Sequence, residues 1–431
     1  MRHFLTCVLA LLCLGITLDG TAQVTAFVGA RILPITGDPI ENGTILIEND
    51  LILKVGTSDT VRIPDGATVY SVEGKTLMPG LVCTHSHIGD VSGGDSSHPI
   101  QPDVRVRDSI NVRDATVSRA RAGGITTANI MSGSGHLLSG QTAYLKLRKG
   151  NSIDDLTIRT PDGRIAGGIK MANGTNPRKD SPFPGTRAKS AALMREQFIK
   201  AIEYRSKLQA ARDDPEKSVD RDLGLEALVE VLDGNRVVHH HTHRHDDILT
   251  VLRLKEEFGF RVVLHHVSEA WKVADEIAAT KTPCSIIMID SPGGKLEARD
   301  IDWKNGAILE RVGVLTGFHT DDPITDSRWF LRSAGFAVRA GMSRQAALYG
   351  MTMAGATMLD LEDRIGSLAP GKDADFIILS GDPLSIYTRI EETWIEGERV
   401  FNLANPQDRL WANGGDGAGS PRLFQHCCFN R

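Results

Sequence analysis

Residues 77–87 read Leu77-Met78-Pro79-Gly80-Leu81-Val82-Cys83-Thr84-His85-Ser86-His87, an apolar run that ends in two histidines separated by one residue. In a β-strand, residues i and i+2 point to the same face, so His85 and His87 can present two imidazoles to one metal ion. An apolar strand that stops at its ligands is typical of the carboxyl end of a parallel strand, where α/β barrels keep their chemistry. Because two histidines at this spacing also arise by chance at exposed strand ends, the pair indicates a metal site only together with further ligands.

Strand-like runs continue after His87 and alternate with segments of helical periodicity. Together with the strand that precedes His85, they make eight, the others lying at 124–130, 143–147, 165–170, 236–241, 261–266, 284–288 and 312–317. Helical patterns separate several of them, at 190–212, 223–232, 248–258 and 270–279. This order predicts an α/β fold, a (β/α)8 TIM-like barrel over residues 78–365.

The segments on both sides of the predicted barrel are rich in β-forming residues. Residues 23–77 contain short β-branched runs separated by turn signals such as Asn42-Gly43, and the same texture returns within 366–405. We therefore expect the two segments to form one small β-sandwich domain that the barrel interrupts. The Gly- and Asn-rich residues 406–431 are expected to form a loose C-terminal tail.

Composition and the first residues limit the setting in which the protein acts. The formal charge is -5 without a long basic run, so nucleic acid is not an expected partner. Residues 1–22 have a positive start and an apolar core shorter than the ~20 residues of a spanning helix, which predicts a cleaved signal peptide, a secreted or periplasmic protein and no membrane partner after cleavage. An uncleaved anchor is the alternative. Cys83 and Cys284 lie in apolar runs, and Cys427 and Cys428 lie in the tail. This distribution does not predict a framework of disulfide bonds.

Metal-competent side chains stand at the ends of several predicted barrel strands. His85 and His87 end the first strand, Lys170 the fourth, His241 with His243 the fifth and His266 the sixth, while His319-Thr320-Asp321 follows the eighth. Ends of different parallel strands meet at one mouth of a barrel, so these residues can share an ion although they are far apart in sequence. This convergence predicts a metal site.

These motifs resemble those of the amidohydrolase superfamily. The resemblance rests on His85-Ser86-His87 after Pro79-Gly80, on the later strand-end histidines and on Thr320-Asp321. The closing segment, with Ala354-Gly355-Ala356-Thr357 and Gly371-Lys372-Asp373-Ala374-Asp375, is similar to the imidazolonepropionase-like branch, and the match spans about residues 24–402. It implies that His85, His87 and Asp321 bind one metal and that His241 and His266 are the histidines of the fifth and sixth strands.

The resemblance leaves the number of ions open. Lys170 falls where some members carry a carboxylated lysine that bridges two metals. Without carboxylation, His85, His87, His241 and Asp321 would hold a single ion and His266 would polarise the substrate. Zinc is the expected divalent metal, with manganese, iron or cobalt as alternatives.

Several assignments have a plain structural alternative. The run 239–245 also fits a solvated histidine-rich loop, and only strand register favours His241 and His243 over His240. Between His265 and His266 the resemblance selects the second, and a lysine such as Lys170 is usually an exposed charge. Expected substrate contacts are His243, Gln141, Arg178 or Arg187, and His319, although the arginines equally fit an ordinary surface loop.

The resemblance implies hydrolysis of an amide-type C–N bond in a small molecule by a metal-activated hydroxide. Asp321 would move the proton and His266 would stabilise the oxyanion. Dipeptides and N-acyl amino acids are the first expected substrates. The alternatives are a cyclic amide hydrolase of the imidazolonepropionase type, an aminohydrolase (deaminase), or a non-enzymatic exported metal-binding protein. A homo-oligomer is possible.

Overall fold

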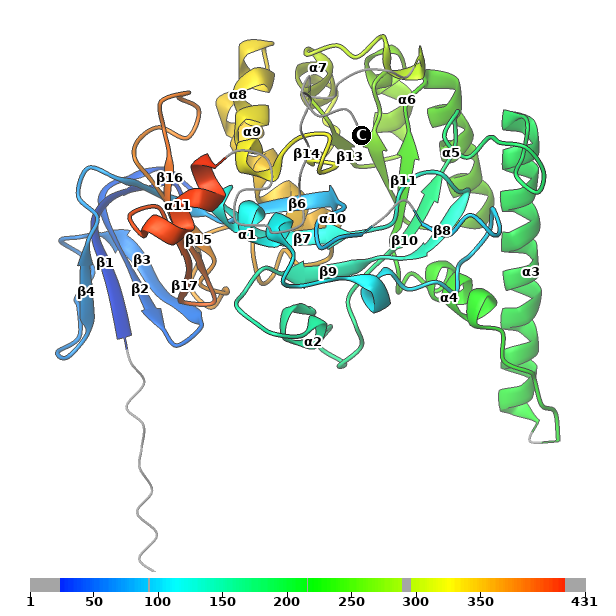
Figure 1. Cartoon of the computed structure of the whole chain (residues 1–431), viewed down its shortest axis with the longest axis horizontal. Helices are drawn as coiled ribbons and strands as arrows, with labels where there is room; N and C mark the ends of the chain where they lie inside the picture. Colours follow the sequence, from blue (N-terminus) through cyan, green and yellow to red (C-terminus); the bar gives the residue numbers. More distant parts are fainter. Residues whose placement is uncertain (1–23, 92–93, 215, 289–295, 415–431) are drawn as a thin grey trace, which may run out of the picture.

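The computed structural model describes residues 24–91, 94–214, 216–288 and 296–414. Over these residues a TIM-barrel-like α/β unit stands beside a β-rich domain (Figure 1). The predicted signal peptide and the two cysteines of the tail lie outside the described residues. No helix in the described part of the chain is both long and apolar enough to cross a membrane.

The β-rich domain is built from both ends of the chain, as predicted. Strand β5 lies at the junction, since it pairs parallel with β1 and antiparallel with β15, with Pro79 opposite Phe376. The rings of Phe27, Phe376 and Trp394 pack at 4.9–5.7 Å between centroids inside this sheet. Its eight strands are β1 (Val24–Ile32), β2 (Ile40–Glu48), β3 (Leu51–Thr57), β4 (Thr68–Ser71), β5 (Thr76–Pro79), β15 (Phe376–Leu379), β16 (Ile390–Ile395) and β17 (Glu398–Asn402).

The barrel begins one residue after β5, so the apolar run of residues 77–87 serves both units. Strands β10 to β14 form one continuous parallel ladder, and β6 pairs parallel with β7. The barrel strands are β6 (Leu81–Ser86), β7 (Ile125–Ile130), β8 (Leu138–Gln141), β9 (Ala143–Lys146), β10 (Ile169–Ala172), β11 (Val238–Thr242), β12 (Val262–His266), β13 (Cys284–Ile286) and β14 (Thr316–Phe318).

The third position of the barrel differs from the parallel strand that the sequence predicts. It is filled by β8 and β9, and both run antiparallel to their neighbours: β9 to β7 and β8 to β10. The loop between β7 and β8 contains no described helix, and a short connection of this kind allows only an antiparallel return. Residues at the end of β8 therefore lie at the amino-terminal ends of the parallel strands.

Helices cover the outside of the barrel, with the long α3 at its edge (Figure 1). They are α1 (Ala115–Ala122), α2 (Ile153–Leu156), α3 (Arg187–Asp213), α4 (Leu223–Leu232), α5 (His245–Phe258), α6 (Ala274–Ala279), α7 (Asn305–Arg311), α8 (Arg332–Arg339), α9 (Arg344–Met351), α10 (Met353–Met358) and α11 (Pro406–Asn413). The prediction of a loose tail from residue 406 is wrong for its first part. The Asn405 side chain accepts hydrogen bonds from the backbone N–H groups of Gln407 and Asp408, and Pro406 is the first helical residue. Both features stabilise the start of α11.

The barrel closes between β14 and β6 without a β-ladder among the described residues. Single hydrogen bonds join the two strands instead: the Asp321 backbone N–H donates to the His85 carbonyl at 3.0 Å, and the Thr84 hydroxyl to the Phe318 carbonyl at 3.4 Å. We refer to this junction as the seam. It places Asp321 beside His85.

Candidate metal centre

The two histidines that end β6 meet Asp321 at the seam. Oδ1 of Asp321 lies 2.9 Å from Nε2 of His87 and 3.2 Å from Nε2 of His85. The other ring nitrogen of His87, Nδ1, lies 2.6 Å from the carbonyl oxygen of Met131, which fixes the orientation of the ring. One carboxylate oxygen and two imidazole nitrogens thus converge, as the strand-end argument predicts.

His266 brings a further nitrogen to this group. One ligand atom each from His85, His266 and Asp321 lie within 4.8 Å of one another. His266 and Asp321 both have positive φ angles, of 70° and 51°, which non-glycine residues rarely adopt. Such backbone strain is concentrated at functional sites, and at His266 it ends the strand alternation.

A second cluster on the far side of His266 consists of histidines only. His241, His243 and His266 each offer a nitrogen within 4.8 Å of the other two, and the Asn176 amide nitrogen lies 3.3 Å from Nε2 of His241. His240 turns the other way and lines a separate pocket with residues of α3 and α5. The structure therefore agrees with the strand register that favours His241 and His243 over His240.

Lys170 stands at the centre of the barrel rather than on its surface. Its side chain is fully buried, and Nζ lies 3.3 Å from Nε2 of His85. The plain alternative, an exposed lysine at a strand end, is therefore wrong. A buried ammonium group opposes binding of a cation at the same place, whereas a carboxylated lysine would carry a negative charge there.

Burial determines the charge of these groups. It lowers the pKa of His85 well below the ordinary value, and the neighbouring Lys170 adds to this effect. Burial together with His241 has the same effect on the pKa of His266. Burial alone would raise the pKa of Asp321, but His266 and the hydrogen bond with His87 outweigh it and hold that pKa well below its usual value. At neutral pH His85 and His266 are thus neutral and Asp321 is ionised, the protonation states in which these groups bind metals.

His319 lies behind the ligands. Its ring is fully buried and stacks on His85, Nδ1 is 2.8 Å from the Ser285 hydroxyl, and Nε2 is 3.2 Å from Nδ1 of His266. It contacts Nδ1 of His266 and leaves Nε2 of that ring without a hydrogen bond to any described residue. This position supports a role in orienting His266 more than the predicted contact with substrate.

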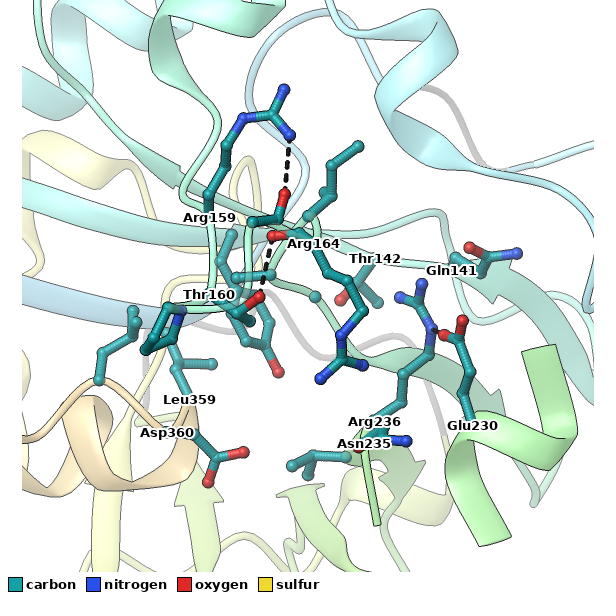
Figure 2. A pocket seen from close by; sticks show the side chains of 18 of the residues that line it. Gln141, Thr142, Arg159, Thr160, Arg164, Glu230, Asn235, Arg236, Leu359 and Asp360 are labelled. Carbon is teal, nitrogen blue, oxygen red and sulfur yellow. Dashed lines mark hydrogen bonds and ion pairs between the residues drawn. The ribbon is translucent and has the colours of Figure 1, made fainter. Parts of the chain in front are cut away.

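Gln141 is not at this mouth of the barrel. It pairs with Ile169 at the start of β10 and donates to the Pro102 carbonyl, so the prediction that it faces the active end is wrong. It lines a cavity of about 490 Å³ with Arg164 and Arg236 (Figure 2). Its pairing with Ile169 puts it at the amino-terminal ends of the parallel strands. The error follows from the antiparallel direction of β8.

The two candidate arginines differ in their contacts. The Nε of Arg187 donates to both carboxylate oxygens of the buried Asp247, and its NH2 lies 3.6 Å from Glu297. Arg187 is thus used to hold the loop after β10 against α5. Arg178 donates from Nε to the Gly174 carbonyl and forms no ion pair with a described acidic residue, so it is the better candidate for an anionic substrate.

The sequence argument missed two members of this polar core. Nε2 of His265 lies 3.0 Å from Nδ1 of His239, whose Nε2 lies 2.8 Å from the Tyr144 hydroxyl. The i, i+2 spacing of His239 and His241 signals that both face inward. No sequence signal shows that His265 and His266 both reach the interior, because that depends on the positive φ of His266.

The donor set fits a divalent transition metal. Imidazole nitrogens and a carboxylate oxygen are the ligands that Zn²⁺ and its neighbours prefer. Nε2 of His266 and Nδ1 of His85 are buried and make no hydrogen bond with any described residue, which is unusual for polar atoms inside a protein.

Comparisons with known proteins identify the family of this chain. Residues 269–401 match the model of the amidohydrolase family. The chain is 26% identical over 402 residues to the amidohydrolase tasK of Hapsidospora irregularis, covering 85% of this chain but only 41% of tasK. It is 24% identical over 413 residues to a 5-methylthioadenosine/S-adenosylhomocysteine deaminase of Symbiobacterium thermophilum, covering 82% of this chain and 84% of that protein.

A solved structure is also similar to this chain over most of its length. The crystal structure of an amidohydrolase from Thermotoga maritima MSB8 superposes with a TM-score of 0.82 at 33% sequence identity, over 88% of this chain and 100% of that chain. Fold, strand-end ligands and relatives point the same way, and the chain belongs to the amidohydrolase superfamily.

Proposed function

We propose that this protein hydrolyses an amide-type C–N bond in a dipeptide or an N-acyl amino acid, and that it belongs to the imidazolonepropionase-like branch. The observation that carries the proposal is the meeting of Asp321 Oδ1 with Nε2 of His85 and of His87, beside the buried Lys170. The ligands would be His85, His87 and Asp321 for one ion, and His241 with His266 for a second. His243 stands next to the latter pair.

Lys170 is the residue that favours two ions. Its neutral amine can add to carbon dioxide, forming a carbamate N–C bond and releasing one proton. The product would replace a cation by an anion beside His85. When bound, a divalent cation lowers the pKa of water from 15.7 to about 7 and so supplies a nucleophile at neutral pH.

The remaining chemistry belongs to the protein side chains. Asp321, ionised at neutral pH, accepts the proton of the attacking water and returns it to the leaving nitrogen. If Lys170 is not carboxylated, the neutral His266 stabilises the oxyanion from its unpartnered Nε2. Arg178 would bind the carboxylate of the substrate, because a guanidinium group matches a planar anion.

A second candidate is an aminohydrolase acting on a ring C–N bond. The deaminase relative from Symbiobacterium thermophilum, which covers most of this chain, favours it. Incubation of the purified protein with dipeptides, N-acyl amino acids, cyclic amides and aminopurines separates the candidates. Release of an amino acid supports our proposal, whereas release of ammonia alone supports the second. Inactivity on all four panels combined with tight metal binding would indicate a metal-binding protein without catalytic function.

Arg178 offers a finer test of the substrate class. We expect Arg178→Ala to raise KM for substrates with a free carboxylate and to leave KM for their amidated forms unchanged. Arg178→Lys should recover part of the loss, since it restores the charge without the planar geometry. Equal KM values for wild type and Arg178→Ala would remove this residue from the substrate site.

A further inference from the structure

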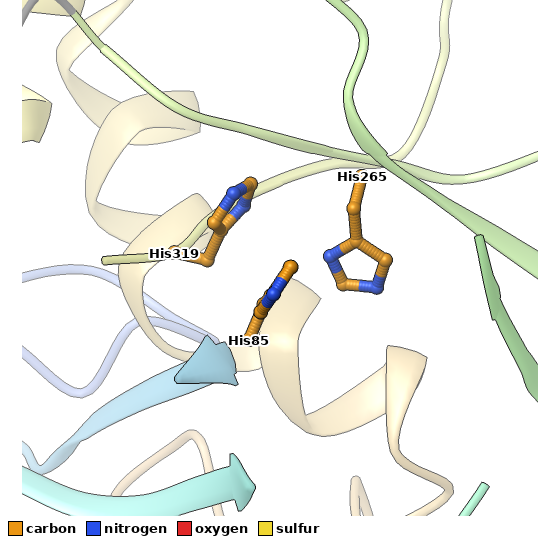
Figure 3. Close-up of side chains that lie close together, drawn as sticks. All are labelled: His85, His265 and His319. Atoms are coloured by element: carbon orange, nitrogen blue, oxygen red, sulfur yellow. The ribbon is translucent and has the colours of Figure 1, made fainter. Parts of the chain in front are cut away.

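Three imidazoles also converge deeper in the barrel, next to the ligands described above. His85, His265 and His319 each offer one ring nitrogen, and these three nitrogens lie within 4.8 Å of one another. All three side chains are fully buried, and the ring centroids are 5.0–5.4 Å apart. Figure 3 shows His265 turning one edge of its ring toward His85 and His319.

Two nitrogens in this cluster make no hydrogen bond. Nδ1 of His85 and Nδ1 of His265 are buried and have no partner among the described residues. Nε2 of His85 is close to Asp321 and Lys170, at 3.2 and 3.3 Å, so its Nδ1 is the nitrogen that the proposed catalytic centre leaves unused. Buried nitrogens without a partner call for a ligand that uses their lone pairs.

The two outer histidines are held from behind. His265 is fixed through Nε2 by His239, which is fixed in turn by Tyr144. His319 is fixed through Nδ1 by Ser285, whose hydroxyl lies 2.6 Å from that of Thr84. Metal-binding histidines are usually oriented in this way by a hydrogen bond at the second ring nitrogen. Nε2 of His319 also lies 3.2 Å from His266, and this long contact would give way to an ion.

The cluster lies at the seam of the barrel. His85 is in β6 and His319 directly follows β14, the two strands that no ladder joins in the described part of the chain. His265 reaches the same point from β12. A ligand shared by the three residues would connect the strands where backbone pairing is missing.

We propose that His85, His265 and His319 bind a structural transition-metal ion that joins β6 to β14. Three neutral imidazoles without a carboxylate suit Zn²⁺ and similar ions, and not Mg²⁺ or Ca²⁺, which take oxygen ligands. With the catalytic ion also bound, Nε2 of His85 would serve that ion and Nδ1 this one, and the ring would give up its proton to solvent. The site goes beyond the proposed function and does not depend on hydrolytic activity.

Zinc stoichiometry of the full chain tests the proposal. The protein is stripped with a chelator, dialysed to equilibrium against buffered free Zn²⁺ and analysed for bound metal. His265→Gln should bind one ion per chain fewer than wild type. His240→Gln is the matched control, because His240 is buried on β11 but faces away from the cluster. Equal zinc content in wild type and His265→Gln overturns the proposal.

Asp321→Asn separates this site from the catalytic one. It should weaken the ion beside Asp321 and keep the ion of the three histidines, so that the double variant with His265→Gln loses one ion more. If the double variant binds as much zinc as Asp321→Asn, the three-histidine site does not exist, while the proposed function is unaffected.

Should His265→Gln fail to fold, zinc anomalous scattering from wild-type crystals decides. A peak among the three rings supports the site, and a zinc peak at Asp321 without one here overturns it.

Discussion

Nε2 of His87 lies 2.9 Å from Oδ1 of Asp321, although 234 positions separate the two residues. The contact exists because β6 and β14 are neighbours at the seam and both end at the same mouth of the barrel. It joins a residue suited to metal binding to one suited to proton transfer.

Replacing Asp321 tests that contact. Asp321→Asn keeps the shape of the side chain but removes its charge and basicity, so we expect kcat to fall by about 10²–10⁴-fold. Steady-state kinetics on the best substrate gives the value. Asp322→Asn is the control: Asp322 accepts hydrogen bonds from the backbone and hydroxyl of Ser327, so its loss should lower stability and spare kcat. Undiminished turnover in Asp321→Asn would refute the proton-transfer role.

Lys170 leads to a prediction about bicarbonate. If its carbamate bridges two ions, metal uptake by stripped protein should reach two ions per chain with bicarbonate and fewer without it. Lys170→Met should show no bicarbonate effect. Metal analysis after reconstitution under carbon-dioxide-free gas provides the measurement, and one tightly bound ion per chain under both conditions would exclude the bridge.

The buried histidines predict a pH-dependent stability of the metal-free protein. Burial lowers the pKa of His239, His240 and His319 to about 3. Below the ordinary histidine value of ~6.5 the unfolded chain takes up protons that the folded chain cannot, so stability is present above this pH and is lost as pH falls toward 3. Each of these histidines should lower the free energy of unfolding by about 1.4 kcal/mol for every pH unit in that range.

Urea unfolding at pH 7.5 and 5.5 measures this loss. Replacing His240 by Gln removes one such group. The free energy of unfolding should then fall less steeply as the pH is lowered, by the contribution of one proton. A free energy of unfolding that is equal at both pH values would contradict the assignment of neutral buried histidines.

The link between barrel and β domain rests on a buried ion cluster. Nζ of Lys146 in β9 lies 2.5 Å from Asp373 and 2.8 Å from Asp375, next to β15. Lys146→Met leaves the buried Asp375 without a cationic partner, while Asp373 keeps its ion pair with Arg364. The substitution should lower the free energy of unfolding by roughly 3–5 kcal/mol. Lys149→Met is the matched control, because its pair with Glu398 is exposed and should contribute about 0–1 kcal/mol. Equal effects of the two substitutions on urea unfolding would show that the cluster does not stabilise the fold.

The alternation of side chains along a strand and the order of strands and helices can be read from the sequence, and the features that follow from them were predicted. The alternation of side chains along a strand places His85 and His87 on one face and separates His241 from His240. The alternation of strands and helices predicts the barrel, and parallel strands bring Asp321 to the histidines. Asn405 and Pro406 also form a helix-start signal that the sequence contains. The glycine-rich composition of the residues that follow led to the prediction of a loose tail instead.

Features that depend on the path of the chain in space were not predictable in this way. The antiparallel return of β8 moved Gln141 to the far end of the barrel, and nothing in its strand pattern indicates direction. The positive φ of His266 lets it and His265 both face inward, which period-two alternation forbids. The pairing of Arg187 with Asp247 depends on how α3 packs beside α5.

The central claim is that the strand-end ligands hold a cation on which hydrolysis depends. Its most direct test strips the protein with a chelator and titrates Zn²⁺ back while bound metal and C–N bond cleavage are followed together. We predict no cleavage by the metal-free protein and a return of activity in proportion to the metal bound, up to one or two ions beside Asp321. Full activity of protein shown to be metal-free would contradict the account.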